Sequence, residues 1–445
     1  MRHLLSTALI ILSTLVFAQT NLDSVMVSAT RLSVKKYESG KHITTLTAKD
    51  ISELPITSVD ELLQYVAGIN LNSRGAFGVQ SDIGMRGSTF SQVLVLVDNQ
   101  RINDGLTGHF NSNLPIPLSE IHHIEVVHGS ASVSYGADAV GGIIHIKTKT
   151  YVGMNDKEPQ TELNGTIAYG DHNLTMTDVG LRAQQSRFGY SAAMKSSQSS
   201  GEQLVNPNFI NNGLGDSLYH NYFDLKTYTA ALTFKSKYWK IYARAGADQR
   251  DFAAKYFYTA SSFDEATEKI NSYWSQASVA YEANGSQTAL NIGYRHNHDS
   301  FIFNPAFSPN SHTTKRINAT LSHNTSIGNT KLSFGAQTDF NTITSNDRGD
   351  HNIINNALFA LAHKKIDQLN LNGGLRLEHS EKIGLQLIPQ LNLSLPKNNI
   401  VYRASAGRSI RQADFTESYN FYLRKNTPGG FSIGNPDLKA ESAYT

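Results

Sequence analysis

Residues 369–395 read LNLNGGLRLEHSEKIGLQLIPQLNLSL, and leucine recurs at every second position along much of this stretch. Successive side chains of a β-strand point to opposite faces of a sheet. The leucines therefore fall on one face, and the polar residues between them fall on the other. This alternation predicts strands with one wet face and one face against an apolar environment.

About thirteen segments of this kind follow residue 160. Each is roughly ten residues long, whereas strands of soluble proteins average about five or six, and roughly ten residues cross a bilayer at a tilt. The connections between them alternate in length. Long ones lie near 197–222, 249–272, 298–314, 342–353 and 409–438, a medium one near 379–384, and short ones near 235–237, 283–286, 326–329, 364–367 and 396–399. A soluble sandwich has no reason to sort loops by strand parity, so we expect a transmembrane β-barrel with short periplasmic turns and long extracellular loops.

The composition excludes several classes of protein. The chain has 445 residues, 39 Lys and Arg against 37 Asp and Glu, 17% charged residues and no cysteine. Without cysteine there is no disulfide framework, thiolate metal site, cysteine nucleophile or lipid-bearing N-terminal cysteine. A net charge of +2 does not favour nucleic-acid binding.

The first 18 residues have the pattern of a secretory signal peptide. Arg2 and His3 form a basic start, the run from Leu4 to Phe17 is apolar, and Ala18 offers a small residue at the cleavage site. The run is too short for a membrane-spanning helix. No later stretch approaches spanning length, so we expect that the mature chain lies in a membrane only as a barrel.

Residues 43–150 differ from the rest of the chain and predict a small α/β domain. Apolar residues recur at near-helical spacing from Ala48 to Tyr65, where Pro55 interrupts the pattern. Val93–Val97 is continuously apolar, as in a strand buried on both faces. Two further strands are predicted at Ile124–Val127 and Ile143–Ile146.

A series of motifs resembles those of TonB-dependent outer-membrane receptors, in the order of that family. Asp23–Arg31 is similar to a TonB box, and Gly407–Phe415 and Gly434–Leu438 are similar to late-barrel motifs. The motifs similar to the family's plug are Met85–Gly87, Val93–Asp98, Ile124–Gly129 and Tyr135–Ile146. The spacing is closest to the vitamin B12 (cobalamin) receptor branch, with siderophore receptors next. His128, Ser130 and His145 stand where the family usually has Arg, Pro and Asn, which concerns the details of plug packing.

The resemblance implies an N-terminal α/β plug domain inside an antiparallel transmembrane β-barrel. We expect a signal peptide at 1–18, a TonB box and linker at 19–42, the plug at 43–150 and part of the barrel at 151–445. A plug of about 125 residues is roughly 35 Å across, whereas about 14 strands enclose only about 28 Å, so we expect about 22 strands in all. The 13–14 strands present therefore predict an open sheet with unpaired edge strands, and roughly 160–200 further residues.

The segment that resembles a TonB box has a strand-like alternation without Pro or Gly, so it can add as a strand to the edge of a partner's sheet. The alternative is a leader without a binding role. The resemblance assigns contact with TonB to Asp23, Ser24, Val25, Met26, Val27, Ser28, Ala29 and Thr30.

Two polar, glycine-rich loops, Asn72–Ser81 and Asn103–Asn113, are the candidate ligand-binding segments of the plug. The resemblance places such loops at the plug apex, facing the outside; the alternative is solvated loops without a ligand. Arg86 is expected at the interface between plug and wall instead. The potential ligand contacts are Arg74, Phe77, Gln80, His109, Phe110 and Asn111.

No catalytic constellation stands out, so we expect neither an enzyme nor a cofactor. His296 and His298 share one strand face and could chelate a metal, but polar residues facing a wet lumen are the simpler interpretation, and we expect no metal site. Heme uptake is disfavoured, because heme receptors of this kind carry a His between the two late-barrel motifs and no His follows His379.

The resemblance therefore implies import across the outer membrane of a Gram-negative bacterium. Loops and plug would capture a scarce small ligand, and TonB would drive its release. Cobalamin is the first candidate and an iron-siderophore the second; the other expected partner is outer-membrane lipid. A binding or adhesion protein would explain the long loops but not the box and plug. Only Gln19–Asn21 separate the predicted cleavage site from Leu22, where the strand-like segment of the box begins, so we expect no additional signalling domain.

Overall fold

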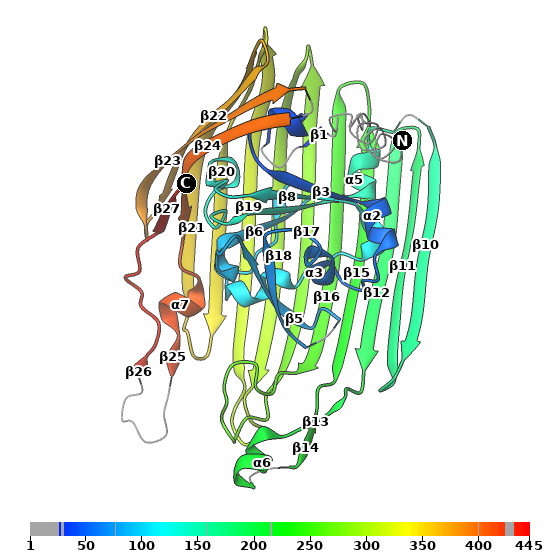
Figure 1. The fold of residues 1–445 in the computed structure, drawn as a ribbon, viewed down its shortest axis with the longest axis vertical. Helices are drawn as coiled ribbons and strands as arrows, with labels where there is room; N and C mark the ends of the chain where they lie inside the picture. The colour runs from blue at the N-terminus through cyan, green and yellow to red at the C-terminus, as the bar shows by residue number, and fades with distance from the viewer. Residues whose placement is uncertain are drawn as a thin grey trace, which may run out of the picture.

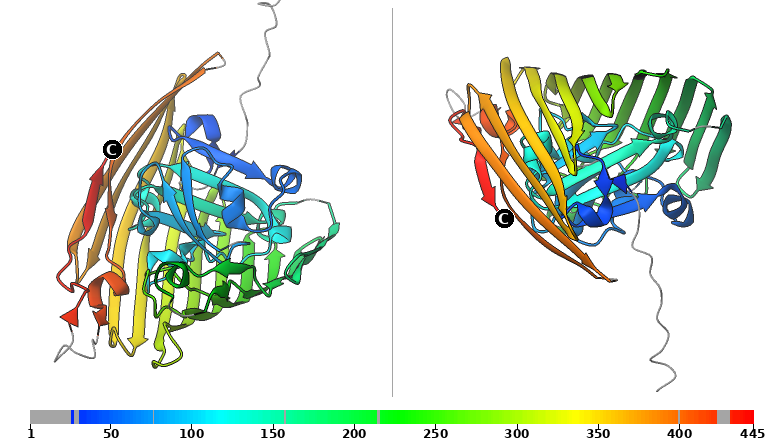
Figure 2. Two further views of the ribbon diagram at one scale, coloured as in Figure 1. Left: turned by 60° about the horizontal axis from the view of Figure 1, so that its bottom comes forward. Right: turned by 90° about the horizontal axis from the view of Figure 1, so that it is seen from above.

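The computed structural model describes residues 26–27, 31–75, 77–156, 158–213, 216–398, 400–422 and 431–445. A small α/β plug and a large antiparallel sheet make up these residues, and the sheet curves around one side of the plug (Figures 1 and 2). The predicted combination of a plug with an open antiparallel sheet is therefore confirmed.

The plug contains a five-stranded sheet in the order β3-β8-β9-β6-β7. Strand β6 pairs in parallel with β9, and the other pairs are antiparallel. As predicted, every residue of β6 is buried. Its valines pack with the helices on one side, while Leu94 and Leu96 pack on the other side against Phe359 of the large sheet. The bounds are β3 Ile43–Thr47, β6 Val93–Val97, β7 Gln100–Arg101, β8 Ile121–His128 and β9 Gly142–Thr148.

Short helices cover the plug sheet. The periodic segment after Ala48 forms α2 (Ala48–Glu53) and α3 (Val59–Leu63), separated at Pro55 as predicted, and Thr47 caps α2 by accepting a bond from Asp50 N. None of the helices in the described part of the chain is long and apolar enough to cross a membrane. The other plug elements are η2 Lys36–Glu38, β4 Ile69–Arg74, β5 Gln80–Met85, η3 Phe90–Gln92, η4 Gly108–Ser112, η5 Leu118–Glu120, α4 Ser132–Tyr135 and α5 Lys149–Gly153.

The large sheet has 14 strands in the described residues, and each strand pairs antiparallel with the next. The thirteen predicted segments and the fourteenth near the end are all present. The sheet consists of β10 Gln160–Gly170, β11 Leu174–Gln185, β12 Phe188–Ser199, β15 Phe223–Lys235, β16 Trp239–Ala253, β17 Thr267–Ala283, β18 Ser286–Ile302, β19 Asn310–Ile327, β20 Thr330–Ser345, β21 His351–Ile366, β22 Leu369–Ser380, β23 Gly384–Lys397, β24 Ile400–Arg411 and β27 Glu441–Tyr444.

Alternation along each strand separates an apolar outer face from a polar inner face. On β18, Leu290, Ile292 and Tyr294 are exposed, whereas Arg295 and Asn297 are buried against the plug. This arrangement is the one expected where lipid lies outside and a polar lumen inside.

The two ends of the sheet differ as predicted. The short turns lie at the end of the sheet shown at the top of Figure 1, which we call the short-turn end. They occur at 186–187, 236–238, 284–285, 328–329 and 367–368 and between β23 and β24. Asn284 and Gly285 both have positive φ, the conformation that a two-residue hairpin turn requires. The long-loop end carries the connections at 200–222, 254–266, 303–309, 346–350, 381–383 and 412–440.

The two outermost strands of the sheet, β10 and β27, are not paired with each other in the described residues. The predicted unpaired edges are thus present. The long connections contain the remaining short elements, namely β13 Gln203–Val205, α6 Pro207–Asn212, β14 Leu218–His220, α7 Phe415–Tyr419, β25 Phe421–Tyr422 and β26 Phe431–Ser432.

Candidate functional site

The tip of the β4–β5 hairpin and helix η4 form the plug apex, which faces the long-loop end. Gln80 contacts Tyr258 of the 254–266 connection, with the amide nitrogen 2.7 Å from the phenol oxygen. All six predicted ligand contacts lie on these two plug segments and the turn between β4 and β5. The fold therefore brings together residues that are more than thirty positions apart in the sequence.

A carboxylate holds the two basic side chains of the apex. Asp82 Oδ2 lies 2.7 Å from Arg74 Nη1, and Asp82 Oδ1 lies 2.6 Å from His109 Nδ1. The Arg74 guanidinium also lies 5.7 Å from the ring centroid of Tyr258, and His109 stacks on Phe90 at 4.1 Å. Arg74 and His109 are partly exposed while Asp82 is buried, so the apex presents oriented donors on a fixed base.

The two predicted aromatic contacts occupy different environments. Phe77 is partly exposed, with its ring centroid 5.7 Å from that of Phe223. Phe110 is only 3% exposed and packs in a cluster with Phe252 and Phe415. Asn111 is also buried and donates to Phe90 O at 3.1 Å. Phe110 and Asn111 could reach a ligand only after the structure above them moves, so their ligand contact stays a prediction.

A segment of the 412–440 connection covers this part of the apex. We call Asp414–Tyr419 the α7 latch. Phe415 N and Thr416 N donate to the carbonyls of Gly105 and Leu106 at 3.1 and 3.0 Å, and Gly108 N donates to Asp414 Oδ2 at 3.1 Å. Burial and the adjacent Glu417 raise the pKa of the Asp414 carboxyl to about 7.

Sequence reasoning missed the latch, although the Asp414 to Glu417 spacing of a capping box marks a helix start there. Its plug partners, more than three hundred positions earlier in the chain, have no comparable sequence pattern.

The predicted TonB-binding segment is described only at Met26 and Val27, and Asp23, Ser24, Val25, Ser28, Ala29 and Thr30 lie outside the described residues. Met26–Val27 forms strand β1, which pairs antiparallel with β2 (Val34–Lys35). The described part of the segment thus has extended backbone that pairs as a strand. Contact with TonB stays a prediction.

A cavity of about 930 Å³ lies at the short-turn end between the plug and strands β16–β20. Its lining includes Arg31, the last residue of the segment that resembles a TonB box, and the next two residues, Leu32 and Ser33. Lys331 Nζ donates to Ser33 O at 2.8 Å, and the Arg31 guanidinium lies 4.3 Å from the Tyr135 ring centroid. The segment after the box is therefore attached both to the wall and to the plug.

The plug side of this cavity is polar. Lys147 Nζ donates to Asn99 Oδ1 at 2.8 Å, and burial lowers the pKa of Lys147. Burial also lowers the pKa of Arg31 to about 10. On the wall side, the buried Ser333 Oγ has no hydrogen-bond partner within the described residues. Such a lining suits a hydrated space or a polar solute better than an apolar ligand.

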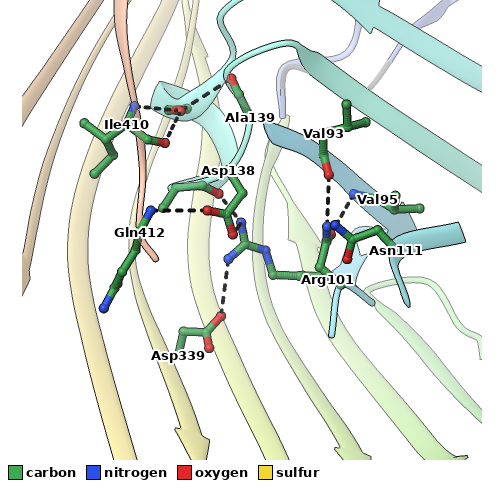
Figure 3. A network of polar contacts seen from close by, with 12 residues as sticks. Val93, Val95, Arg101, Asn111, Asp138, Ala139, Asp339, Ile410 and Gln412 are labelled. Atoms are coloured by element: carbon green, nitrogen blue, oxygen red, sulfur yellow. Dashed lines mark hydrogen bonds and ion pairs between the residues drawn. The ribbon is translucent and has the colours of Figure 1, made fainter. Parts of the chain in front are cut away.

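Buried ion pairs hold the plug to the wall. Arg101 Nη2 lies 3.3 Å from Asp138 Oδ2 of the plug, and Arg101 Nη1 lies 3.9 Å from Asp339 Oδ2 of β20 (Figure 3). Asp138 Oδ1 also accepts a bond from Gln412 N. Removing Arg101 would leave the buried Asp138 without its ion pair, whereas Asp339 would keep Arg316, whose Nη2 lies 2.8 Å away.

A second buried network surrounds Glu120 of η5. Its carboxylate pairs with Arg244 of β16 and accepts a bond from Ser191 of β12 at 2.7 Å. Arg244 Nε donates to Tyr242 OH, which in turn donates to Asp98 Oδ2 at 2.5 Å. The sequence offers one signal for these residues, since Arg244 and Tyr242 alternate with outward apolar side chains and so must face the lumen.

One expectation about a pair of side chains is wrong. His296 and His298 do not face the lumen, because they share the outer face of β18 with Tyr294, and the buried residues Arg295 and Asn297 face inward. Arg86 is exposed among the described residues, so its expected place at the interface between plug and wall stays a prediction. No group of three or more His, Cys, Asp or Glu side chains in the described ranges could hold a metal ion.

Comparison with known families agrees with this architecture. Residues 35–143 match the TonB-dependent Receptor Plug Domain, and residues 198–445 match the family described as TonB dependent receptor-like, beta-barrel. Since the second match covers more than half of the chain, the chain belongs to the TonB-dependent receptor family.

Individual relatives are similar over different extents. The Vitamin B12 transporter BtuB of Vibrio vulnificus is 37% identical over 157 residues, which cover 35% of this chain and 24% of that protein. A mutant of the ferric enterobactin receptor PfeA of Pseudomonas aeruginosa superimposes with a TM-score of 0.73 at 16% identity, covering 94% of this chain and 69% of that one. The siderophore receptor PirA of the same species gives 0.67 at 17% identity, covering 90% and 70%. At these identities the structural neighbours show the fold alone.

Proposed function

We propose that this chain is a TonB-dependent importer of the outer membrane of a Gram-negative bacterium, with cobalamin as the first candidate ligand. The observation that carries the proposal is that the two predicted binding regions of the plug lie at opposite ends of the sheet. Its candidate ligand contacts lie at the long-loop end, whereas the segment that follows the predicted box lies at the short-turn end beside the cavity. One body could thus receive a ligand at one end and a mechanical signal at the other.

Capture is assigned to the apex and the surrounding long connections. Arg74 and His109 offer N–H donors fixed by Asp82, and Phe77 and Tyr258 offer partly exposed ring surface. Aromatic surface with a few fixed polar groups is the usual chemistry of a small-molecule site. The long connections place this site on the side from which an external ligand arrives.

Release is assigned to the opposite end. A partner that pairs with the strand at Met26–Val27 would gain backbone hydrogen bonds, so it could pull on the chain that leads to Arg31–Ser33. That segment lines the cavity, and its displacement would open the space toward the short-turn end. A change in plug state releases ligand only if the two states bind it with different affinity.

Cobalamin is preferred because the relative that is 37% identical is a vitamin B12 transporter. A ferric siderophore is the second candidate, in line with the siderophore receptors that share the fold. Growth of a deletion strain on limiting cobalamin and on limiting iron distinguishes them. Loss of growth on cobalamin alone supports the first candidate, and loss of siderophore uptake alone would reverse the order. Binding without any uptake would support an adhesion or binding protein instead.

Energy coupling is tested by Val27→Pro. Proline removes the backbone N–H and fixes φ, so strand pairing at this position should be lost. Uptake by whole cells should fall to the level of a strain without TonB, while ligand binding stays unchanged. Val27→Ala is the matched control, because it shortens the side chain and keeps the N–H. Normal uptake by Val27→Pro would refute the assignment of the box.

A further inference from the structure

The short-turn end of the sheet carries an excess of positive charge. Within two residues of the six short turns, the only acidic residues in the sequence are Glu282 and Asp367. Around the long connections the balance is reversed, and acidic residues outnumber basic ones. We call the basic residues within two positions of the short turns the basic rim. They are Arg187, Lys235, Lys237, Lys240, Lys331, Lys365 and Lys397.

Much of this charge is accessible and uncompensated. Arg187, Lys237, Lys365 and Lys397 are exposed. Glu282 Oε1 lies 2.7 Å from Lys240 Nζ and also accepts a bond from Gln287 at 2.6 Å, so this carboxylate is already neutralised within the wall. The exposed part of the rim therefore keeps a net positive charge.

Exposed apolar and aromatic side chains lie directly beside the rim. Lys237 Nζ is 4.9 Å from the Tyr238 ring centroid, and the Trp239 and Tyr281 centroids are 5.0 Å apart on the outer face. Trp and Tyr favour the layer between hydrocarbon and water, where one part of the ring is apolar and the other is hydrated. The exposed apolar residues next to the turns include Phe188, Tyr238, Trp239, Tyr281, Ile327, Ile366 and Ile400.

The shape of the rim favours a lipid leaflet over a protein partner. The rim extends from the β11–β12 turn to the β23–β24 turn, across twelve strands. At about 4.8 Å per strand this is roughly 55 Å of sheet edge. A protein interface of standard size covers about 800 Å² on each partner, a compact patch that would meet only a few hairpins. A membrane leaflet meets every hairpin at the same depth.

We propose that the exposed part of the basic rim, namely Arg187, Lys237, Lys365 and Lys397, binds the phosphate headgroups of anionic phospholipids in the leaflet at the short-turn end, with Trp239 and Tyr281 in the interfacial layer below them. The inference rests on the proposed placement of the sheet in a membrane, and it requires neither the ligand nor TonB. Each Lys or Arg near an anionic membrane surface contributes a favourable interaction that corresponds to about a fivefold preference for anionic over neutral lipid beside it. Salt screens the attraction over about 10 Å, so the enrichment should fall at high ionic strength.

The test uses energy transfer from tryptophan in phosphatidylcholine vesicles that hold the purified receptor. Traces of dansyl-labelled phosphatidylglycerol or dansyl-labelled phosphatidylcholine are the acceptors. Trp239 lies at the rim, whereas Trp274 is buried against the plug, so transfer reports mainly on lipid beside the short turns. The triple variant Lys237→Gln, Lys365→Gln and Lys397→Gln removes three exposed rim charges. The triple variant Lys49→Gln, Lys269→Gln and Lys439→Gln removes three charges elsewhere as the matched control.

We expect the wild-type receptor and the control to transfer several-fold more to phosphatidylglycerol than to phosphatidylcholine at low salt. The rim variant should lose this preference. Equal transfer to both lipids in the wild type, or an unchanged preference in the rim variant, would overturn the proposal. The lipid preference is measured without any transport step. It can therefore be confirmed or refuted whether or not the receptor imports a ligand.

Discussion

His128 is a side chain of plug strand β8 that burial keeps neutral. Its Nε2 lies 3.2 Å from Thr44 Oγ1, and its ring centroid lies 4.6 Å from that of His42. Burial, with further contributions from His42 and Arg86, lowers the pKa of His128 to about 4. The pKa of the buried His145 is lowered as well, chiefly by burial.

These shifts predict a pH dependence of plug stability. Between the ordinary His pKa of 6.5 and about 4, the unfolded chain takes up a proton at His128 that the folded plug does not bind. Stability should therefore be fully present above pH 6.5 and decline as the pH falls toward 4. Urea denaturation at several pH values measures the slope. His128→Gln should reduce it, whereas the exposed His172→Gln should not; an equal slope in both variants would contradict the assignment.

Phe77 and Phe110 are predicted to differ in what their truncation changes. Phe77→Ala should weaken ligand binding about fivefold, since one aromatic contact contributes about 1 kcal/mol. Phe110→Ala should instead lower the free energy of unfolding by roughly 3–5 kcal/mol, because the ring is buried in the apical cluster. Equilibrium binding and urea titration separate the two effects, and Phe188→Ala at the opposite end is the control for binding. Unchanged ligand affinity in Phe77→Ala would indicate that the ligand binds the long connections and not the plug apex.

At the scale of elements, the α7 latch connects a long connection to the plug loop 103–113. Three backbone N–H groups and the buried ring of Phe415 form this contact. Gly105 and Leu106 otherwise lie in an irregular segment of the plug. We therefore expect the latch to order the loop that carries His109 and Phe110, and its stability to set how often the buried Phe110 becomes accessible.

Phe415→Ala should release the latch. Amide hydrogen exchange of Leu106 and Gly108 is expected to rise by tenfold or more, because the loss of a buried aromatic ring exceeds 1.4 kcal/mol. Phe421→Ala is the matched control, since it removes a more exposed ring from the same connection. Unchanged exchange in Phe415→Ala would show that the loop is ordered by the plug alone.

At the scale of the whole molecule, buried charge pairs fix the plug inside the sheet. Glu120 meets side chains from β12, β15 and β16, so one plug residue is held by three wall strands. The two charges of a buried ion pair attract each other strongly, and removing one of them leaves the other buried without compensation, which is costly in free energy. The plug is therefore bound tightly as long as every partner is present.

Glu120→Ala should lower the stability of the plug–wall contact by roughly 3–5 kcal/mol, because the buried Arg244 would lose its nearest carboxylate and keep only the more distant Asp98. Trp274 shares a buried cluster with Ile51 and Val95 of the plug, so its fluorescence should change when urea releases the plug. Both variants are made in a Trp239→Phe background, so that Trp274 is the single tryptophan. Glu53→Ala is the control, since its pair with Lys49 is exposed and contributes at most about 1 kcal/mol. Equal urea midpoints in the two variants would show that Glu120 does not hold the plug.

The sequence by itself determined the number of long strands, the sorting of their connections and the buried strand Val93–Val97. These features depend only on residues that are close in the sequence. Alternation with a period of two, turn residues and a proline such as Pro55 each determine the structure of a short stretch of chain. The same local pattern places His296 and His298 on the face of β18 that carries Leu290, Ile292 and Tyr294, which is the apolar outer face, so the alternation itself argued against the lumen. The contacts of Arg295 and Asn297 with the plug agree with this orientation.

Only the tertiary structure decided which distant residues meet. Arg101 faces Asp339 and Gly108 meets Asp414, at sequence separations of more than two hundred residues. No periodicity spans such a distance, because these pairs are chosen when the sheet curves around the plug and desolvates both surfaces at once. The predicted apical loops thus became a defined cluster with Asp82 at its base and the α7 latch above it, an arrangement set by long-range packing and by the need of buried charges for a partner.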